Sequence, residues 1–157
     1  MSITISDFNK QFKATSKKMQ YFIDNTAPRL AGKVVISISK QSFQDESFQG
    51  SHWREVQRRT PSTASYRYNQ KRHPARLTRP ILTGDTGDLA RSIKASYGTA
   101  SVTIFSDKVY AKVHNEGLRS GRGSGFIMPK RQFIGNSPSL QQQVNQAISD
   151  KLNQLFK

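Results

Sequence analysis

The chain is divided into two unlike halves by residues 81–93, which read Ile-Leu-Thr-Gly-Asp-Thr-Gly-Asp-Leu-Ala-Arg-Ser-Ile. Two glycines allow tight turns here, and Asp85 or Thr86 can accept hydrogen bonds from the first free amides of a helix. Asp88 then lies in the first helical turn, where a negative charge is favourable beside the positive end of the helix dipole. Leu89 follows on the side that faces a core. The stretch therefore predicts a turn and a short capped helix, and its polar residues need no catalytic role.

The first part of the chain, residues 1–53, predicts two helices. Apolar residues recur at helical spacing from residue 8 to residue 23, and Ser6 or Asp7 can cap the start. Asn-Thr-Ala-Pro at residues 25–28 predicts a break and the start of a second helix. Residues 30–41 fit a helical face but also alternate as a strand would; their length and start signal favour a helix.

Residues 54–80, called here the basic segment, contain eight Lys and Arg and a single acidic residue, so they supply nearly half of the net charge of +15. The segment has no sustained periodicity, and it predicts a long basic loop that projects as an arm. Loops of this length inside a domain are usually functional or disordered. Trp53, just before it, can anchor the loop to its own core or to a neighbouring subunit, and we favour its own chain.

The composition of the basic segment suits binding to nucleic acid, an acidic protein face or a membrane surface, and it suits equally a basic loop that serves only solubility. Tyrosines between arginines can stack on bases or contact phosphates. The predicted DNA or partner contacts are Arg54, Arg58, Arg59, Arg67, Lys71, Arg72, Arg76, Arg79, Arg119 and Arg122. The predicted interface anchors are Trp53, Tyr66 and Tyr68.

The second half, residues 81–157, predicts short strands and helices. Alternation at residues 93–97 and 102–104 predicts a hairpin with a three-residue turn, and residues 109–116 predict a short helix that Gly117 ends. Residues 118–125 form a flexible glycine-arginine loop, and short strands follow at 126–128 and 132–134. Ser137 caps a terminal amphipathic helix that begins with Pro138. The chain is therefore expected to be a single α+β domain, with a small antiparallel β-sheet packed against N-terminal helices and a C-terminal amphipathic helix.

The residue inventory argues against an enzyme, a cofactor site or a metal site. There is no cysteine, and His52, His73 and His114 show no metal-ligand spacing. A nuclease that uses His114 with a nearby carboxylate is a weaker alternative, because no metal-ligand pattern accompanies that histidine. No apolar run is long enough for a membrane span and the N-terminus lacks signal-peptide features, so we expect a protein made in the cytoplasm with no membrane partner.

Three blocks in the second half resemble the motifs of a known family. The first block is residues 82–93, which is similar to Thr-Gly-x-Leu-x-x-Ser-Ile. The second is residues 110–117, Tyr-Ala-Lys-Val-His-Asn-Glu-Gly, and the third is residues 128–135, Met-Pro-Lys-Arg-Gln-Phe-Ile-Gly. In this order they resemble the phage virion morphogenesis family, the tail-completion or neck proteins of Mu-like and other tailed phages.

The resemblance implies a non-enzymatic structural subunit of the head–tail junction, which assembles as a homo-oligomeric ring around the DNA channel. Its implied partners are other copies, other connector and tail proteins, and genomic DNA that is contacted without sequence readout. The implied location is the virion. The alternative, carried by the basic segment, is a stand-alone nucleic-acid-binding protein that acts in packaging or assembly.

Overall fold

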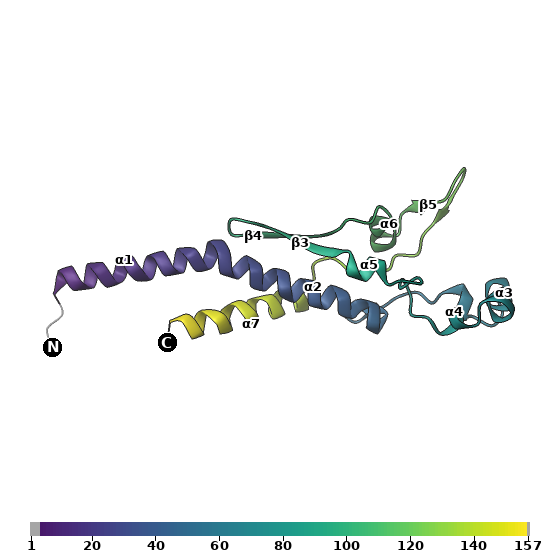
Figure 1. Cartoon of the computed structure of the whole chain (residues 1–157), viewed down its shortest axis with the longest axis horizontal. Helices are drawn as coiled ribbons and strands as arrows, with labels where there is room; N and C mark the ends of the chain where they lie inside the picture. Colours follow the sequence, from purple (N-terminus) through teal and green to yellow (C-terminus); the bar gives the residue numbers. More distant parts are fainter. Residues whose placement is uncertain (1–3, 157) are drawn as a thin grey trace.

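Two long helices that join without a break form the axis of the molecule (Figure 1). The computed structural model describes residues 4–156. Helix α1 (Ile5–Tyr21) continues through the π-helical turn η1 (Phe22–Thr26) into α2 (Ala27–Asp45). The predicted break at residues 25–28 is therefore wrong. Pro28 cannot donate to the carbonyl of Asp24, and this carbonyl instead accepts from the backbone N–H of Ala100 at 3.2 Å.

The ends of the long helices follow simple capping chemistry. The Thr4 hydroxyl accepts from the N–H of Asp7 at 3.2 Å and caps α1, so the predicted caps, Ser6 and Asp7, are wrong. The helical prediction for residues 30–41 is confirmed, since they lie within α2. The terminal helix α7 (Pro138–Leu155) has the predicted cap, with the Ser137 hydroxyl accepting from the N–H of Leu140 at 3.1 Å.

Helix α7 returns along α2 in the opposite direction, so both termini lie at the same end of the molecule (Figure 1). Leu140 at the start of α7 is buried, and the apolar residues of the helix become more exposed toward Leu155. Within residues 4–156 no helix combines the length and the apolar character that crossing a membrane requires.

Each sheet among the described residues consists of two antiparallel strands, so the fold is α+β with separate small hairpins. The largest pairs β3 (Ile93–Gly98) with β4 (Ser101–Ser106) and lies against α2. Gly98 pairs with Ser101, so its turn has two residues rather than the predicted three. The others pair β1 (Ser47–Phe48) with β2 (Ser51–His52), and β5 (Arg119–Ser120) with β6 (Phe126–Ile127). The predicted strand at 132–134 is wrong, because these residues pair with no strand.

The basic segment is helical, and the prediction of an extended loop is wrong. It contains the 3₁₀ turn η2 (Gln57–Arg59) and helices α3 (Ala64–Arg72) and α4 (Ala75–Thr78). The Thr63 hydroxyl accepts from the N–H of Tyr66 at 3.1 Å, so the Ser-Thr cluster acts as a helix cap. These helices form the end of the molecule opposite the termini (Figure 1).

The stretch at 81–93 forms a turn and the four-residue helix α5 (Asp88–Arg91), as expected, but its cap differs. Gly87 precedes the helix with φ of 68°, and no side chain caps it, so the predicted capping by Asp85 or Thr86 is wrong. Asp85 instead pairs with Arg79. Helix α6 (Ala111–Glu116) follows the β3–β4 hairpin and ends, as predicted, at Gly117.

Aromatic residues from two distant parts of the chain form the centre of the core. The ring of Phe43 lies 5.5 Å from that of Trp53, edge to face, and 5.0 Å from that of Phe133. The Trp53 indole N–H donates to the carbonyl of Gln132 at 2.8 Å. Ile81, Leu89, Ile93 and Ala111 complete the buried cluster. The turn at 81–93 is thus fixed to α2 by its apolar residues.

Replacing Phe133, which is fully buried, should destabilise the fold strongly. Phe133→Ala removes a ring that touches Phe43, and we expect a loss of about 3–5 kcal/mol of unfolding free energy. Urea denaturation followed by tryptophan fluorescence measures this. Val109→Ala, at a side chain that is 93% exposed, is the control and should change the free energy by less than about 0.5 kcal/mol. Equal stability of the two variants would contradict this core.

Candidate functional site

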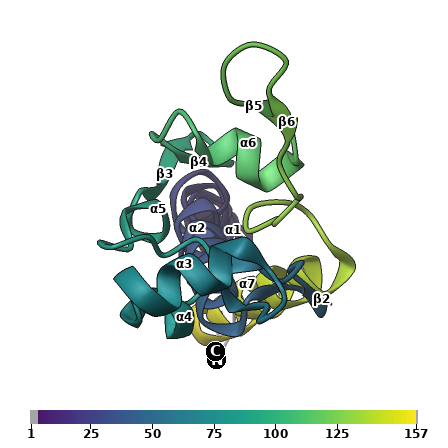
Figure 2. The same cartoon turned by 90° about the vertical axis from the view of Figure 1, so that its right-hand side faces the viewer.

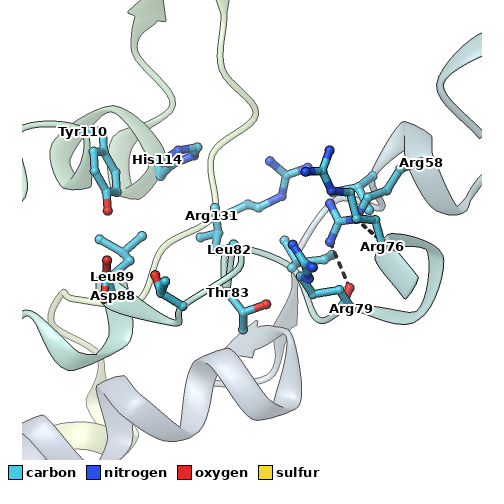
Figure 3. Close-up of a pocket in the computed structure, with 14 residues that line it drawn as sticks. Arg58, Arg76, Arg79, Leu82, Thr83, Asp88, Leu89, Tyr110, His114 and Arg131 are labelled. Atoms are coloured by element: carbon cyan, nitrogen blue, oxygen red, sulfur yellow. Dashed lines mark hydrogen bonds between the residues drawn. The ribbon is translucent and has the colours of Figure 1, made fainter. Parts of the chain in front are cut away.

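The three blocks quoted from the sequence converge around one cavity of about 460 Å³ (Figure 3). Leu82 and Thr83 come from the first block, Tyr110 and His114 from the second, and Arg131 from the third. We call this space the cationic cavity. Segments separated by almost 50 residues therefore build a single site.

Asn115 joins the second block to the third. Its side-chain oxygen accepts from the N–H groups of Phe133 and Ile134, both at 2.9 Å, and its amide donates to the carbonyl of Ile134 at 3.0 Å. The N–H of Arg131 also donates to the carbonyl of His114 at 2.8 Å. These bonds replace the strand pairing predicted for residues 132–134 and fix Arg131 beside His114.

Arg58, Arg76 and Arg79 of the basic segment form the second wall of the cavity (Figure 3). The Arg58 guanidinium donates to the carbonyls of Arg76 and Arg79, both at 2.9 Å, and to that of Pro80 at 3.1 Å. Burial lowers the pKa of Arg58, and the neighbouring charges of Arg59 and Arg79 lower it further. The chain has therefore placed positive charges close together at an electrostatic cost.

Arg131 is the most buried charge of the site, with 6% of its surface exposed. Its guanidinium donates to the carbonyl of Arg54 at 2.9 and 3.2 Å and forms no salt bridge among the described residues. Burial lowers the pKa of Arg131, and the charge of Arg54 lowers it further. Burial and the charge of Arg131 also lower the pKa of His114, which favours its neutral imidazole.

Carboxylates offset this charge only in part. Asp85 pairs with Arg79 and lies 3.9 Å from Arg76, while Asp88, at the cavity wall, pairs with Arg91 at 2.6 Å. Ion pairing thus accounts for both aspartates. Residues 4–156 contain no group of three or more His, Asp or Glu side chains placed to hold a metal ion.

A second and larger cavity, about 1000 Å³, shares Arg58, Arg76 and Arg131 with the first. Its other side carries Phe126 and Ile127 of β6, which are 55% and 64% exposed. The surface here combines guanidinium groups with apolar side chains. Such a surface suits acidic groups of a protein or nucleic acid, because arginine binds carboxylates and phosphates through paired donors.

The structure places the predicted contact residues in several different surroundings. Arg54, Arg58, Arg76 and Arg79 line these cavities, whereas Arg67, Lys71 and Arg72 lie on exposed positions of α3. Arg119 and Arg122 belong to the β5–β6 hairpin, whose loop extends away from α3 and α4 (Figure 2).

The predicted anchors also have different surroundings. Trp53 is buried in its own core, as we favoured, so it offers no surface to a neighbouring subunit. Tyr66 is half-buried, and Tyr68 is 59% exposed beside the ring of His73 at 5.9 Å. Tyr68 is thus the anchor with most of its ring surface available.

Arg131, His114 and Tyr110 line the cationic cavity but were not among the predicted contacts. Arg131 could have been selected only from its place in the third block, since it follows a single lysine in an otherwise uncharged stretch. Its importance comes from its burial, which sequence does not reveal.

Arg59, by contrast, has a structural role. It donates to the Glu46 carboxylate at 2.5 and 2.7 Å and to the carbonyl of Arg79 at 2.8 Å. Glu46 also accepts from the N–H of Ile81 at 2.8 Å. This pair fastens both ends of the basic segment to the end of α2.

Replacing Glu46 should weaken this attachment in a pH-dependent way. The hydrogen bond from Arg59, then the one from Ile81, lower the pKa of Glu46 from 4.5. A carboxyl group whose pKa is lower in the folded than in the unfolded protein stabilises the fold at pH values above its unfolded-state pKa. This stabilisation is lost as the pH falls through the folded-state pKa. Glu46→Gln should therefore cost about 1–2 kcal/mol at pH 7 and little at pH 3.

Urea titrations of both proteins at several pH values between 3 and 7 measure the difference. Glu55→Gln is the control, because the side chain of Glu55 is 56% exposed and lies 3.7 Å from Arg59. It should cost less than about 0.5 kcal/mol. A pH-independent effect of Glu46→Gln would rule out the ionic contribution.

In comparison with known proteins, one family model matches a region that contains all three blocks. The model of the phage virion morphogenesis family matches residues 9–153. The Mu-like prophage FluMu G protein 2 of Haemophilus influenzae is 29% identical over 73 residues, which cover 46% of this chain and 53% of that protein. The chain thus spans about half the length of this curated relative. No solved structure matches. Because the family match covers most of the sequence, the chain belongs to the phage virion morphogenesis family.

Proposed function

We propose that this chain is a structural subunit of the phage head–tail junction, a neck or tail-completion protein that forms a homo-oligomeric ring around the DNA channel. Membership of a virion morphogenesis family supports a role in virion assembly. The partial similarity to a protein of a Mu-like prophage supports the same class. The role is non-enzymatic, and its partners are further copies, other connector and tail proteins, and DNA in the channel.

The observation that carries the proposal is the joining of the family blocks with the basic segment in one cationic wall. Arg131 of the third block and Arg58 and Arg76 of the basic segment line the same two cavities. A subunit at a DNA channel needs this kind of surface, because phosphates are attracted by positive charge without sequence readout. Acidic side chains of a neighbouring connector protein are suited to the recessed arginines.

The second candidate is a stand-alone nucleic-acid-binding protein. The exposed residues Arg67, Lys71 and Arg72 on α3, together with the exposed ring of Tyr68, favour it. The two candidates differ in the species that acts: a ring subunit functions as an oligomer in the particle, whereas the alternative functions as a monomer that is absent from virions.

Deletion of the gene from the phage that encodes it tests the proposed role. We expect DNA-filled heads and tails that are not joined, or tails that do not mature, with infectivity restored by the gene supplied in trans. Electron microscopy of lysates and plaque counts measure this outcome. Normal numbers of infectious particles with complete tails would contradict the proposal.

Neutralising the exposed cations of α3 should weaken DNA binding by the purified chain. The triple variant Arg67→Gln, Lys71→Gln, Arg72→Gln is expected to reduce the salt dependence of binding by up to about three counterions and to lower affinity at low salt. The control carries the same charge change elsewhere, as Lys112→Gln, Lys130→Gln, Lys151→Gln. Fluorescence anisotropy over a salt series gives both quantities. An equal loss in both variants would mean that net charge, not this surface, binds DNA.

The size of the DNA-bound species separates the two candidates in the same experiment. Sedimentation of the complex should show an oligomer if the chain is a ring subunit. A bound monomer, with virions that lack the protein, would favour the stand-alone candidate.

A further inference from the structure

Helix α1 carries an apolar stripe that its own chain does not cover. None of its 17 residues is buried, and Ile5, Phe8 and Phe12 are 82%, 60% and 64% exposed. The rings of Phe8 and Phe12 stack with centroids 6.3 Å apart. At 3.6 residues per turn these side chains and Met19 lie on one face of the helix. We call this face the α1 stripe.

The charges of α1 lie away from the stripe. The same helical period places Lys10 and Lys17 on the opposite face and Lys13 and Lys18 on the sides, whereas the uncharged Asn9 and Ser16 border the stripe. A surface that avoids charge around exposed aromatic rings is suited to another apolar surface. The lysines would remain accessible to solvent or DNA when the stripe is covered.

A groove of about 430 Å³ lies where the stripe reaches the body of the molecule. It continues from Met19 through Phe22 and Ile23, and its other walls carry Val102 of β4 together with Ile148 and Leu152 of α7. The lining is mostly apolar. Helix α7 packs mainly against α2. At its C-terminal end Leu155 and Phe156 remain 49% and 39% exposed.

We propose that the α1 stripe of one copy binds in this groove of a second copy, so that copies associate head to tail. Each chain then contributes the exposed part of α1 to one neighbour and the groove at the base of α1 to the other. A contact between two different surfaces of the same chain repeats from copy to copy and closes into a ring when the rotation permits. The inference rests on the proposed ring and names the surfaces that build it.

The exposed apolar area supplies part of what a subunit contact requires. Phe8 and Phe12 together leave roughly 250 Å² in water, because an aromatic side chain carries about 200 Å². With Ile5 on the stripe, and Ile23, Leu155 and Phe156 on the groove side, the two opposing surfaces together expose roughly 600 Å². A specific interface buries about 800 Å² per partner. The polar borders of the stripe and groove supply the remainder.

The assembly state of the full-length chain tests the stripe. The variant Phe8→Glu, Phe12→Glu should leave the fold intact, since both rings are exposed, and should raise the dissociation constant of the oligomer about 100-fold or more. The control Lys10→Gln, Lys17→Gln makes the same change of net charge on the opposite face and should assemble like the wild type. Sedimentation velocity over a concentration series measures assembly, and circular dichroism checks folding.

Cross-linking tests the groove, because the natural chain contains no cysteine. One protein carries Phe12→Cys and a second carries Leu155→Cys, at two exposed positions. Oxidation of a mixture should join the two proteins to each other more than either to itself. Cross-links formed mainly between two Phe12→Cys copies would indicate pairing of α1 with α1 and would overturn the head-to-tail contact.

The outcomes separate this inference from the proposed function. If the Phe8→Glu, Phe12→Glu protein assembles like the wild type, the stripe is not the contact, although a ring in the virion remains possible. A wild-type chain that stays monomeric and instead binds anionic lipid vesicles through Phe8 and Phe12 would also overturn the inference. The gene deletion described above tests the place in the virion independently of either result.

Discussion

The contact of Phe43, Trp53 and Phe133 is the interaction on which the rest of the structure depends. It brings together the end of α2, the start of the basic segment and the third family block, and the Trp53 indole bond to Gln132 fixes their relative positions. Phe133 is 80 or more residues away from both Phe43 and Trp53 along the chain. Hydrophobic burial alone does not set such geometry, whereas an edge-to-face ring contact and a buried N–H donor do. Arg131 and the basic segment are next to residues of this cluster in the sequence. The cluster therefore brings them together around the cationic cavity.

The positive charge of the chain has two separate uses. Arg58, Arg59 and Arg131 hold backbone carbonyls or a carboxylate and thereby shape the wall of the site. The exposed cations of α3 and the lysines of α1 opposite the stripe take no part in these bonds and remain exposed. Burial lowers the pKa of Arg58 and of Arg131, and neighbouring positive charges lower both further, so holding these cations together costs folding free energy. A partner that supplies negative groups would relieve this repulsion, as the proposed contacts with DNA or a connector protein require.

Sequence patterns predicted the elements whose signals are local. The long amphipathic helices, the β3–β4 hairpin and the Ser137 cap followed from periodicity and capping chemistry, and the α+β class followed from them. The helices of the basic segment were missed because nine residues with little apolar content give no helical face, and α3 is stabilised by a Thr63 cap and tertiary contacts. The continuous helix through Pro28 depended on the distant N–H of Ala100. The cavity required burial and long-range pairing, such as the bonds of Asn115, which no spacing reveals.

The molecule is elongated (Figure 1), with a cationic wall at one end and an uncovered apolar helix at the other. Both features cost free energy in an isolated protein, and contacts with neighbouring molecules would offset this cost. Cryo-electron microscopy of the virion, at a resolution that distinguishes helices, tests this most directly. We predict a closed ring of this fold at the head–tail junction, with α1 of each copy against the next copy and cationic residues facing DNA or a connector protein. A junction without this fold, or copies present there without mutual contact, would contradict it.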